Sequence, residues 1–239
     1  MTTPPAAVGD VAILVPAAGA GVRMGPGAPK ALRELAGTPL LVHAVRRMAM
    51  APSVGLIVVA APAADVAGVA AMLADIDRCE VVAGGATRQL SVAAALRVVP
   101  AAYDMILVHD AARALAPPDL VESVAAAVRA GAVAVIPVLP VVDTIKRVGA
   151  DGEVLATVDR TPLRAVQTPQ GFRRKTLVEA HERAVDTHTD DAGMVEAMGV
   201  RVDSVLGSDR AFKITRPFDL VLAEALLALD ATEGELGSN

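Results

Sequence analysis

Short apolar segments alternate with helix-forming segments through the first 138 residues, and this alternation constrains the fold more than any other feature. Apolar segments of about four to eight residues bounded by glycine or proline are typical of buried strands. Pairs such as Thr38-Pro39 and Pro118-Asp119 are typical helix starts. The expected strands are 11–15, 54–60, 80–82, 105–108 and 132–138, and the expected helices are 38–50, 65–76, 87–98 and 118–130. This order predicts an α/β fold with a mostly parallel sheet flanked by helices.

The composition agrees with one α/β domain covering all 239 residues. Hydrophobic residues make up 54% of the chain, whereas aromatic residues make up only 2%. The core must therefore consist mainly of Ala, Val, Leu and Ile, which suits strands that helices cover on both faces.

Charge and cysteine content exclude several classes of protein. The net charge of −5 argues against nucleic acid as a partner, because such binding needs a basic surface. A single cysteine, Cys79, excludes a disulfide framework.

The start MTTPPAAVGD lacks the features of a signal peptide, so we expect a cytoplasmic protein. The longest uncharged segments, 54–64 and 132–142, are short and contain proline, so no membrane span is expected.

Residues 139–166 interrupt the alternation. Two segments rich in β-formers, 144–148 and 154–158, flank the turn 149–152 and predict a hairpin that leaves the domain as an arm. Because a two-stranded hairpin is marginally stable alone, we expect the arm to pack on a second copy of the chain and form a homodimer. The remaining expected elements are helices at 173–185 and 191–198, strands at 200–206 and 212–214, and a helix from Pro217.

The loop after the first strand, VPAAGAGVRMGPGAPKAL at 15–32, indicates a phosphate site, because glycine lets backbone N–H groups approach phosphate. A dinucleotide fingerprint needs a third glycine, but Met24 stands at that position. A P-loop needs Gly-Lys-Ser/Thr, and the sequence around Lys30 does not provide it. The loop therefore suits a nucleoside triphosphate, with the cations Arg23 and Lys30 beside its phosphates. The alternative is that both are solvated loop charges.

Further motifs carry a resemblance to a known family. They are ILVHDAAR at 106–113, VDTIK at 142–146, TVDRTPL at 157–163, QTPQ at 167–170, TDDAG at 189–193 and FKITRP at 212–217. With the first loop, these motifs resemble the 2-C-methyl-D-erythritol 4-phosphate cytidylyltransferases of the non-mevalonate isoprenoid pathway over nearly the whole chain. The resemblance implies a Rossmann-like nucleotidyltransferase fold. It also implies transfer of CMP from CTP to methylerythritol phosphate, with release of pyrophosphate.

The resemblance also implies a set of site residues. Those for the nucleotide are Pro16, Ala17, Ala18, Gly19, Gly21, Arg23, Lys30, Gly85, Ser91, Asp110 and Lys213. Those for the alcohol phosphate are Asp110, Arg113, Thr144, Arg160, Thr168 and Lys213, and the catalytic cations are Arg23, Lys30, Arg160 and Lys213. Ala86 stands where the family often has an acidic residue, which leaves Gly85 and Ser91 as base-side candidates. Thr144 and Arg160 lie on the arm, so in a dimer the arm would complete the neighbour's site.

The chemistry implied by the resemblance needs no general base. A phosphate monoester has a second pKa of about 6, so the nucleophile is already ionised at neutral pH. Mg²⁺ is expected to arrive with CTP, and no protein residue is predicted as a metal ligand. Asp110 has the alternative role of capping the next helix, and His109 is expected to pack in the core or to support the site residues, with no part in the chemistry.

Three alternative functions remain open at this point. The chain resembles cytidylyltransferases for ribitol 5-phosphate in its nucleotide loop. The other two alternative functions are a non-catalytic nucleotide sensor and a dehydrogenase.

Overall fold

The computed structural model describes residues 9–19, 30–184 and 188–236. Its centre is an eight-stranded sheet in the order β10-β7-β11-β6-β1-β4-β5, with β12 paired to β7. The strands are β1 (Val11–Pro16), β4 (Val54–Ala61), β5 (Cys79–Ala83), β6 (Met105–Val108), β7 (Ala134–Pro140), β10 (Arg164–Val166), β11 (Gln170–Arg173) and β12 (Asp203–Leu206). β1 runs parallel to both β4 and β6, with Ile13 opposite Ile57 and Leu107. The predicted mostly parallel sheet is confirmed.

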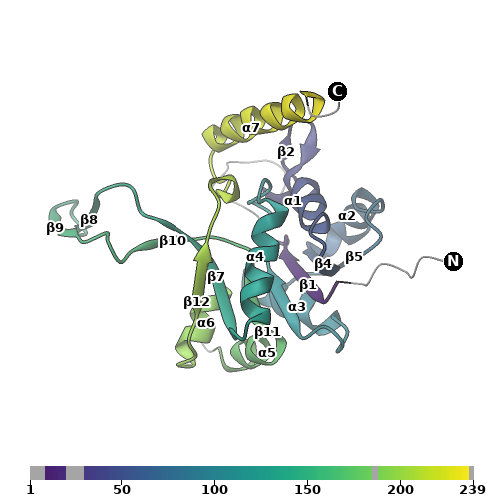
Figure 1. Cartoon of the computed structure of the whole chain (residues 1–239), viewed down its shortest axis with the longest axis horizontal. Helices are drawn as coiled ribbons and strands as arrows, with labels where there is room; N and C mark the ends of the chain where they lie inside the picture. Colours follow the sequence, from purple (N-terminus) through teal and green to yellow (C-terminus); the bar gives the residue numbers. More distant parts are fainter. Residues whose placement is uncertain (1–8, 20–29, 185–187, 237–239) are drawn as a thin grey trace.

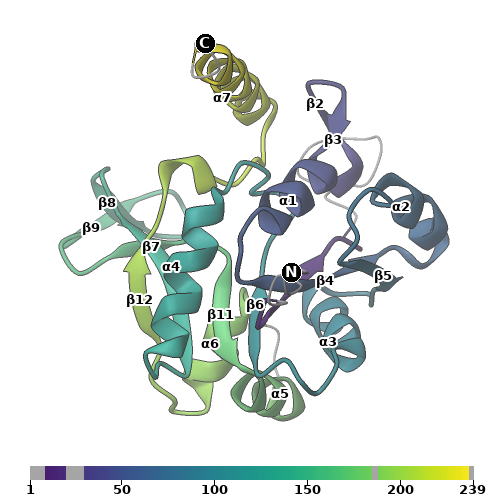
Figure 2. The ribbon, with the colours of Figure 1, turned by 45° about the vertical axis from the view of Figure 1, so that its right-hand side comes forward.

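Two layers of helices cover the sheet (Figure 2). On β1, Ile13 packs with the helices of one face, whereas Leu14 packs with those of the other. The first face carries α1 (Leu40–Ala49), α2 (Val66–Met72) and α4 (Pro118–Arg129), and the second carries α3 (Arg88–Val98), α5 (Arg174–Arg183) and α6 (Asp191–Ala197). The aliphatic composition is explained by strands that are buried on both sides.

β11 lies antiparallel between β6 and β7, which the sequence pattern did not predict. Gln170 is paired with Val108 at the end of β6, so the residues just before β11 lie beside those just after β6. Gly171 is required on this strand, because a Cβ there would lie 2.5 Å from Cγ1 of Val124 on α4. β11 thereby brings Thr168 next to the end of a parallel strand.

Helices α1 and α2 both differ from the sequence prediction at their ends. Residues 38–39 form strand β3 (Thr38–Pro39), which pairs with β2 (Glu34–Leu35), so Thr38 does not cap a helix. Ala36 and Gly37 have φ angles of 49° and 74° and make the tight turn between these strands. The α2 helix is also shorter than predicted and is preceded by the 3₁₀ turn η3 (Ala63–Asp65).

The segment 212–214 is not a strand, contrary to the prediction. It follows the 3₁₀ turn η4 (Asp209–Ala211) and passes beside the loop after β6, where Ile214 N–H donates to the Ala112 carbonyl at 2.8 Å. This bond joins a loop to a loop, and it brings Lys213 to the end of the sheet.

The predicted hairpin is present as a separate two-stranded antiparallel sheet, β8 (Ile145–Val148) and β9 (Val154–Val158). Figure 1 shows it at the end of an arm that projects from the body of the molecule and returns through β10. Val148, Val154 and Leu155 on the hairpin are each more than half exposed. The arm thus presents apolar side chains that its own chain does not cover.

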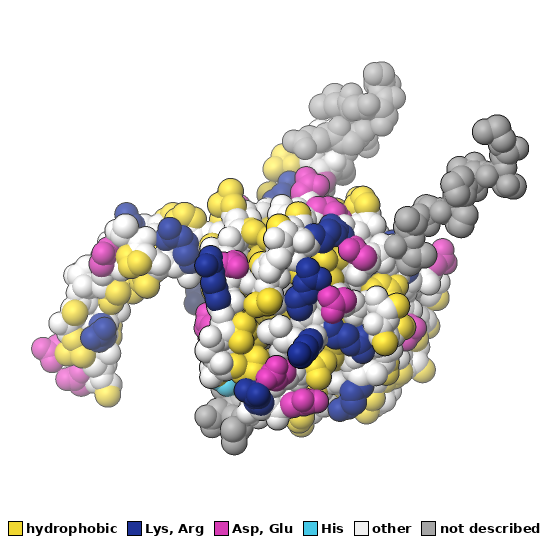
Figure 3. Space-filling view, turned by 60° about the horizontal axis from the view of Figure 1, so that its bottom comes forward, with side chains coloured by type: hydrophobic (Ala, Val, Ile, Leu, Met, Phe, Trp, Pro, Cys, Tyr) yellow, Lys and Arg dark blue, Asp and Glu magenta, His cyan; other side chains and the backbone are white. Residues whose placement is uncertain are grey.

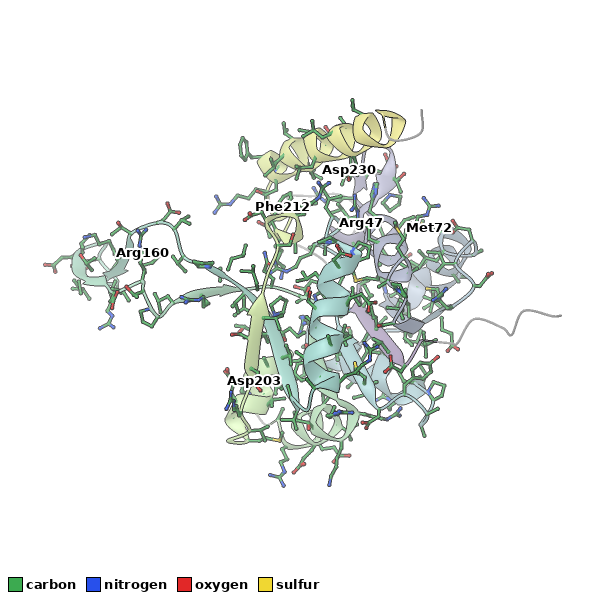
Figure 4. The ribbon with its side chains drawn as sticks, in the orientation of Figure 1. Arg47, Met72, Arg160, Asp203, Phe212 and Asp230 are labelled. Carbon is green, nitrogen blue, oxygen red and sulfur yellow. The ribbon has the colours of Figure 1, made fainter. Side chains whose placement is uncertain are left out.

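The long helix α7 (Pro217–Leu236) lies across the end of the molecule. Ala223 of this helix packs with Leu35, Leu115 and Ile214. Asp230 accepts hydrogen bonds from Arg47 of α1, at 2.8 Å, and from Arg210 of η4 (Figure 4). Helix α7 therefore fastens the turn that precedes Lys213.

Surface charge and helix length bear on possible partners. On the face shown in Figure 3, basic and acidic side chains are interspersed, so no extended basic surface forms among the described residues seen there. Within the described ranges, no helix has both the length and the apolar character needed to cross a bilayer.

Candidate active site

The loops that follow β1, β5 and β6 meet at one edge of the sheet. Open α/β sheets bind ligands at the carboxyl ends of their parallel strands. At this edge lies a pocket of about 180 Å³, lined by Pro16, Ala17, Ala18, Gly19, Ala31, Arg88, Ser91, Asp110, Ala111, Ala112 and Lys213. Seven predicted nucleotide residues therefore line one cavity: Pro16, Ala17, Ala18, Gly19, Ser91, Asp110 and Lys213.

The loop after β5 closes one side of this pocket. A Cβ on Gly84 would lie 2.6 Å from the Cβ of Ala18, so only glycine allows the two loops to approach this closely. The Ser91 hydroxyl donates to the Thr87 carbonyl at 2.8 Å and accepts from Gly85 N–H at 3.2 Å. Ser91 thus lines the pocket and holds Gly85 beside it.

The first loop is described only in part. Gly21 and Arg23 lie outside the described residues. Lys30 begins the 3₁₀ turn η2 (Lys30–Leu32), next in the chain to Ala31, which lines the pocket.

A second pocket of about 210 Å³ adjoins the first. It is lined by Arg88, Asp110, Arg113, Val166, Gln167, Thr168, Gln170, Thr189, Asp190 and Lys213. The two pockets share Arg88, Asp110 and Lys213, which we call the dividing wall. Of the residues predicted for the alcohol phosphate, Asp110, Arg113, Thr168 and Lys213 meet in the second pocket.

Hydrogen-bonded ion pairs hold the dividing wall together. Asp110 Oδ1 accepts from Arg88 Nε at 3.1 Å, and Asp110 Oδ2 accepts from Lys213 Nζ at 2.6 Å. Burial alone would raise the pKa of the Asp110 carboxyl, but the charges of Arg88 and Lys213 outweigh burial and hold its pKa well below the ordinary value. The carboxylate faces these cations, and the next helix, α4, begins only at Pro118, so Asp110 is not a helix cap.

Thr168 contacts both Asp110 and the preceding residue, His109. The Thr168 hydroxyl accepts from Asp110 N–H at 3.0 Å and lies 3.2 Å from His109 Nδ1. His109 is fully buried, and burial lowers its pKa to about 4. His109 is therefore a packed core side chain, as predicted, and its lowered pKa favours the neutral ring.

Arg113 joins two segments beside the second pocket. Its Nη1 donates to the Ala211 carbonyl at 2.6 Å, and its Nη2 donates to the Val166 carbonyl at 3.0 Å. These bonds tie β10 to the turn before Lys213. Arg113 thus positions the wall in addition to lining the pocket.

Comparison with known proteins identifies the family. The family model described as "IspD: 2-C-methyl-D-erythritol 4-phosphate cytidylyltransferase" matches residues 11–229. The chain belongs to this cytidylyltransferase family.

Relatives and solved structures agree with this assignment. A protein from Streptomyces avermitilis named 2-C-methyl-D-erythritol 4-phosphate cytidylyltransferase is 55% identical over 228 residues, which cover 91% of each chain. The structure of the enzyme of that name from Thermus thermophilus has 36% identity and a TM-score of 0.70, covering 90% of this chain and 97% of that one. A 4-diphosphocytidyl-2C-methyl-D-erythritol synthase structure from Anaerococcus prevotii has 26% identity and a TM-score of 0.79, covering 91% and 98%.

Two predicted site residues of this cytidylyltransferase do not reach the pockets of their own chain. Thr144 and Arg160 are exposed on the arm, and neither lines either pocket. Figure 4 shows Arg160 on the projecting arm, well away from the sheet edge.

Sequence reasoning missed Arg88, which lies in both pockets and bonds Asp110. The sequence signal that could have indicated Arg88 was its neighbour Thr87. Thr87 caps α3 by accepting a hydrogen bond from Leu90 N–H, which places Arg88 at the start of that helix. Gln170, Thr189 and Asp190 also line the second pocket. They lie in the motifs QTPQ and TDDAG, to which only Thr168 had been assigned a role.

No group of three or more His, Cys, Asp or Glu side chains within the described ranges is arranged to hold a metal ion. The one carboxylate in the dividing wall, Asp110, has each oxygen bonded to a cation. This donor set fits Mg²⁺ only as an ion that phosphate oxygens hold, which is its common form of binding with nucleotides.

Proposed function

We propose that the two adjoining pockets divide the substrates of the family's reaction between them. The enzyme transfers CMP from CTP to 2-C-methyl-D-erythritol 4-phosphate, giving 4-diphosphocytidyl-2-C-methyl-D-erythritol and pyrophosphate. The observation that supports the division is the dividing wall of Arg88, Asp110 and Lys213, which faces both cavities. Substrates bound in two pockets that share these three residues would be neighbours, as in-line attack requires.

CTP is assigned to the first pocket. Pro16, Ala17, Ala18 and Gly19 form its floor after β1, where backbone N–H groups suit phosphate. Gly21 belongs to the same loop. Ser91 also lines this pocket and accepts a hydrogen bond from Gly85 N–H at 3.2 Å, and both residues are assigned to the base.

Arg23 and Lys30 are assigned to the α-phosphate, where negative charge increases during the transfer. Lys30 is next to the pocket residue Ala31, which supports this role. Mg²⁺ would be held by the CTP phosphates, and when bound it adds positive charge to their oxygens.

Methylerythritol phosphate is assigned to the second pocket. Both oxygens of Asp110 keep lone pairs free beyond their bonds to Arg88 and Lys213, so the carboxylate can accept hydrogen bonds from alcohol hydroxyls. Thr168, Arg113 and Lys213 provide the polar lining, and Lys213 is the cation suited to the substrate phosphate. That phosphate is ionised at neutral pH because its second pKa is about 6, so no side chain needs to remove a proton.

The arm is assigned to a second copy of the chain. It projects from the body and carries the exposed apolar side chains Val148, Val154 and Leu155, which favour burial against a partner. Thr144 and Arg160 of one copy would then complete the second pocket of the other, where Arg160 is suited to bind phosphate in a bidentate manner. Catalysis would then require the homodimer.

A pyrophosphate-release assay tests this function. CTP and Mg²⁺ are supplied with methylerythritol 4-phosphate or, in a parallel reaction, with ribitol 5-phosphate. We expect turnover with methylerythritol 4-phosphate and little with ribitol 5-phosphate. CTP binding without turnover on either alcohol phosphate would instead favour a nucleotide sensor.

A further inference from the structure

Asp191 lies behind the dividing wall and lines neither pocket. It is the first residue of α6, belongs to the TDDAG motif, and is fully buried. Its Oδ2 accepts from Arg88 Nη1 at 2.7 Å, and its Oδ1 lies 3.1 Å from Nε2 of His181. A buried carboxylate away from substrate needs a reason, because an uncompensated charge in the interior is costly.

Arg88 connects this buried carboxylate to the site. Its Nη1 bonds Asp191 and its Nε bonds Asp110 at 3.1 Å. Because a guanidinium is a rigid planar fork, fixing one edge also fixes the direction of the other. The orientation of Asp110 therefore depends on Asp191, although these two carboxylates share no direct contact.

The neighbours of Asp191 in the chain are held by β11, the strand that the sequence pattern did not predict. The Gln170 side chain on β11 donates from Nε2 to Asp190 Oδ2 at 2.7 Å, and its Oε1 accepts from Ala192 N–H at 3.2 Å. Asp190 also accepts from Gly193 N–H at 3.0 Å. The residues on both sides of Asp191 are thus fastened to the sheet.

The bond between Arg88 and Asp191 opposes the attraction of Arg88 to anionic substrates. Both substrates are anions, and an arginine at the boundary of their pockets would be drawn toward incoming phosphate. A second, buried carboxylate keeps Arg88 where it bonds Asp110. Burial alone would lower the pKa of Arg88, but Asp191 and Asp110 raise it above its ordinary value, so the cation is retained.

We propose that Asp191 is a positioning residue for cytidylyl transfer, acting through Arg88 to hold Asp110 and Lys213 in the dividing wall. This inference rests on the proposed function. In that function Asp191 contacts no substrate, and its effect on the site passes through the guanidinium of Arg88.

The test compares Asp191→Asn with Val195→Ala in the full-length enzyme. Val195 is a fully buried residue of the same helix, so its truncation lowers stability without changing a charge. We expect Asp191→Asn to lower kcat/KM by roughly 10- to 100-fold through misplacement of reacting groups. Val195→Ala should keep near wild-type kcat/KM well below its melting temperature. Equal losses of kcat/KM at matched loss of Tm would mean a merely structural role and would overturn the inference.

A double-variant comparison covers the case in which Asp191→Asn does not fold. Arg88→Met is compared with Arg88→Met combined with Asp191→Leu, because replacing both members of a buried ion pair is often tolerated. If Asp191 acts through Arg88, the second substitution adds little further loss of kcat/KM. A further loss of about tenfold or more would show independent action and contradict the proposal.

Wild-type turnover separates this inference from the function on which it rests. If wild type releases no pyrophosphate from CTP and methylerythritol 4-phosphate, the proposed function is wrong and the inference with it. If wild type is active and Asp191→Asn matches it, only the inference is wrong.

Discussion

Lys213 and Asp110 are 103 residues apart in the chain, yet Lys213 Nζ lies 2.6 Å from Asp110 Oδ2. Asp110 follows a strand of the parallel sheet, whereas Lys213 lies on a loop that Arg113 and α7 fasten to the same edge. Both residues line both pockets, so under the proposed function each would act on both substrates.

We expect Lys213→Ala to reduce kcat by a factor of about 10² to 10³, because it removes a cation that we assign to the substrate phosphate. The measurement is pyrophosphate release at saturating CTP, together with a thermal unfolding curve. Lys175→Ala is the matched control, since Lys175 is exposed on α5 and lines neither of the two pockets. Equal rates in the two variants would remove Lys213 from the catalytic set.

Lys30→Ala and Arg23→Ala should each lower kcat on the same scale of about 10² to 10³ while the protein remains folded. The expectation follows from their assignment to the α-phosphate. Arg46→Ala serves as the control, because Arg46 pairs with Asp75 on an exposed surface where ion pairs contribute little. A near wild-type rate for Lys30→Ala would refute that assignment.

Two inactive variants should complement each other if the arm completes the neighbour's site. A chain with Arg160→Ala keeps Lys213, and a chain with Lys213→Ala keeps Arg160, so a mixed dimer contains one intact site. Mixing equal amounts after subunit exchange should restore about a quarter of wild-type activity, since half of the dimers are mixed and each has one good site. Light scattering checks the dimer. A monomer that turns over at the full rate would exclude the shared site.

Gly84→Ala should lower kcat/KM, because a Cβ there would lie 2.6 Å from the Cβ of Ala18 and force apart the two loops beside the first pocket, which we assign to CTP. Gly68→Ala is the matched control, since its Cβ meets nothing within 4 Å on helix α2. Alanine there should stabilise the helix by roughly 0.5–1 kcal/mol. Substrate titrations of both variants would reveal the difference, and an unchanged KM for CTP in Gly84→Ala would argue against the proposed nucleotide pocket.

His109 should make the wild type lose stability as the pH falls below about 6.5, the ordinary histidine value. Burial lowers its folded pKa to about 4, so between these values the unfolded chain binds a proton that the folded chain does not. This effect lowers the free energy of unfolding by roughly 3 kcal/mol at pH 4 and has no influence above pH 7. Urea unfolding of wild type and His109→Gln at pH 7.5, 6 and 5 measures it. The variant should show a smaller decline, and parallel declines would contradict a neutral buried His109.

The sequence predicted the parts of this protein that depend on local pattern. Apolar segments at strand spacing located β1, β4 and β6, and turn residues located the hairpin of the arm, because these signals lie within a few neighbouring residues. Motifs such as HDAAR and KITRP were enough to indicate the family, now shown by the comparisons.

Tertiary structure decided how the site is assembled. The insertion of β11 between β6 and β7 brings Thr168 to Asp110, and Arg88 meets Asp191 across 103 residues of chain. No local pattern specifies such pairs, because a charged side chain has the same sequence signature whether it is solvated or bonded in the interior. Which carboxylate each arginine bonds is determined only when the folded sheet brings segments distant in the chain together.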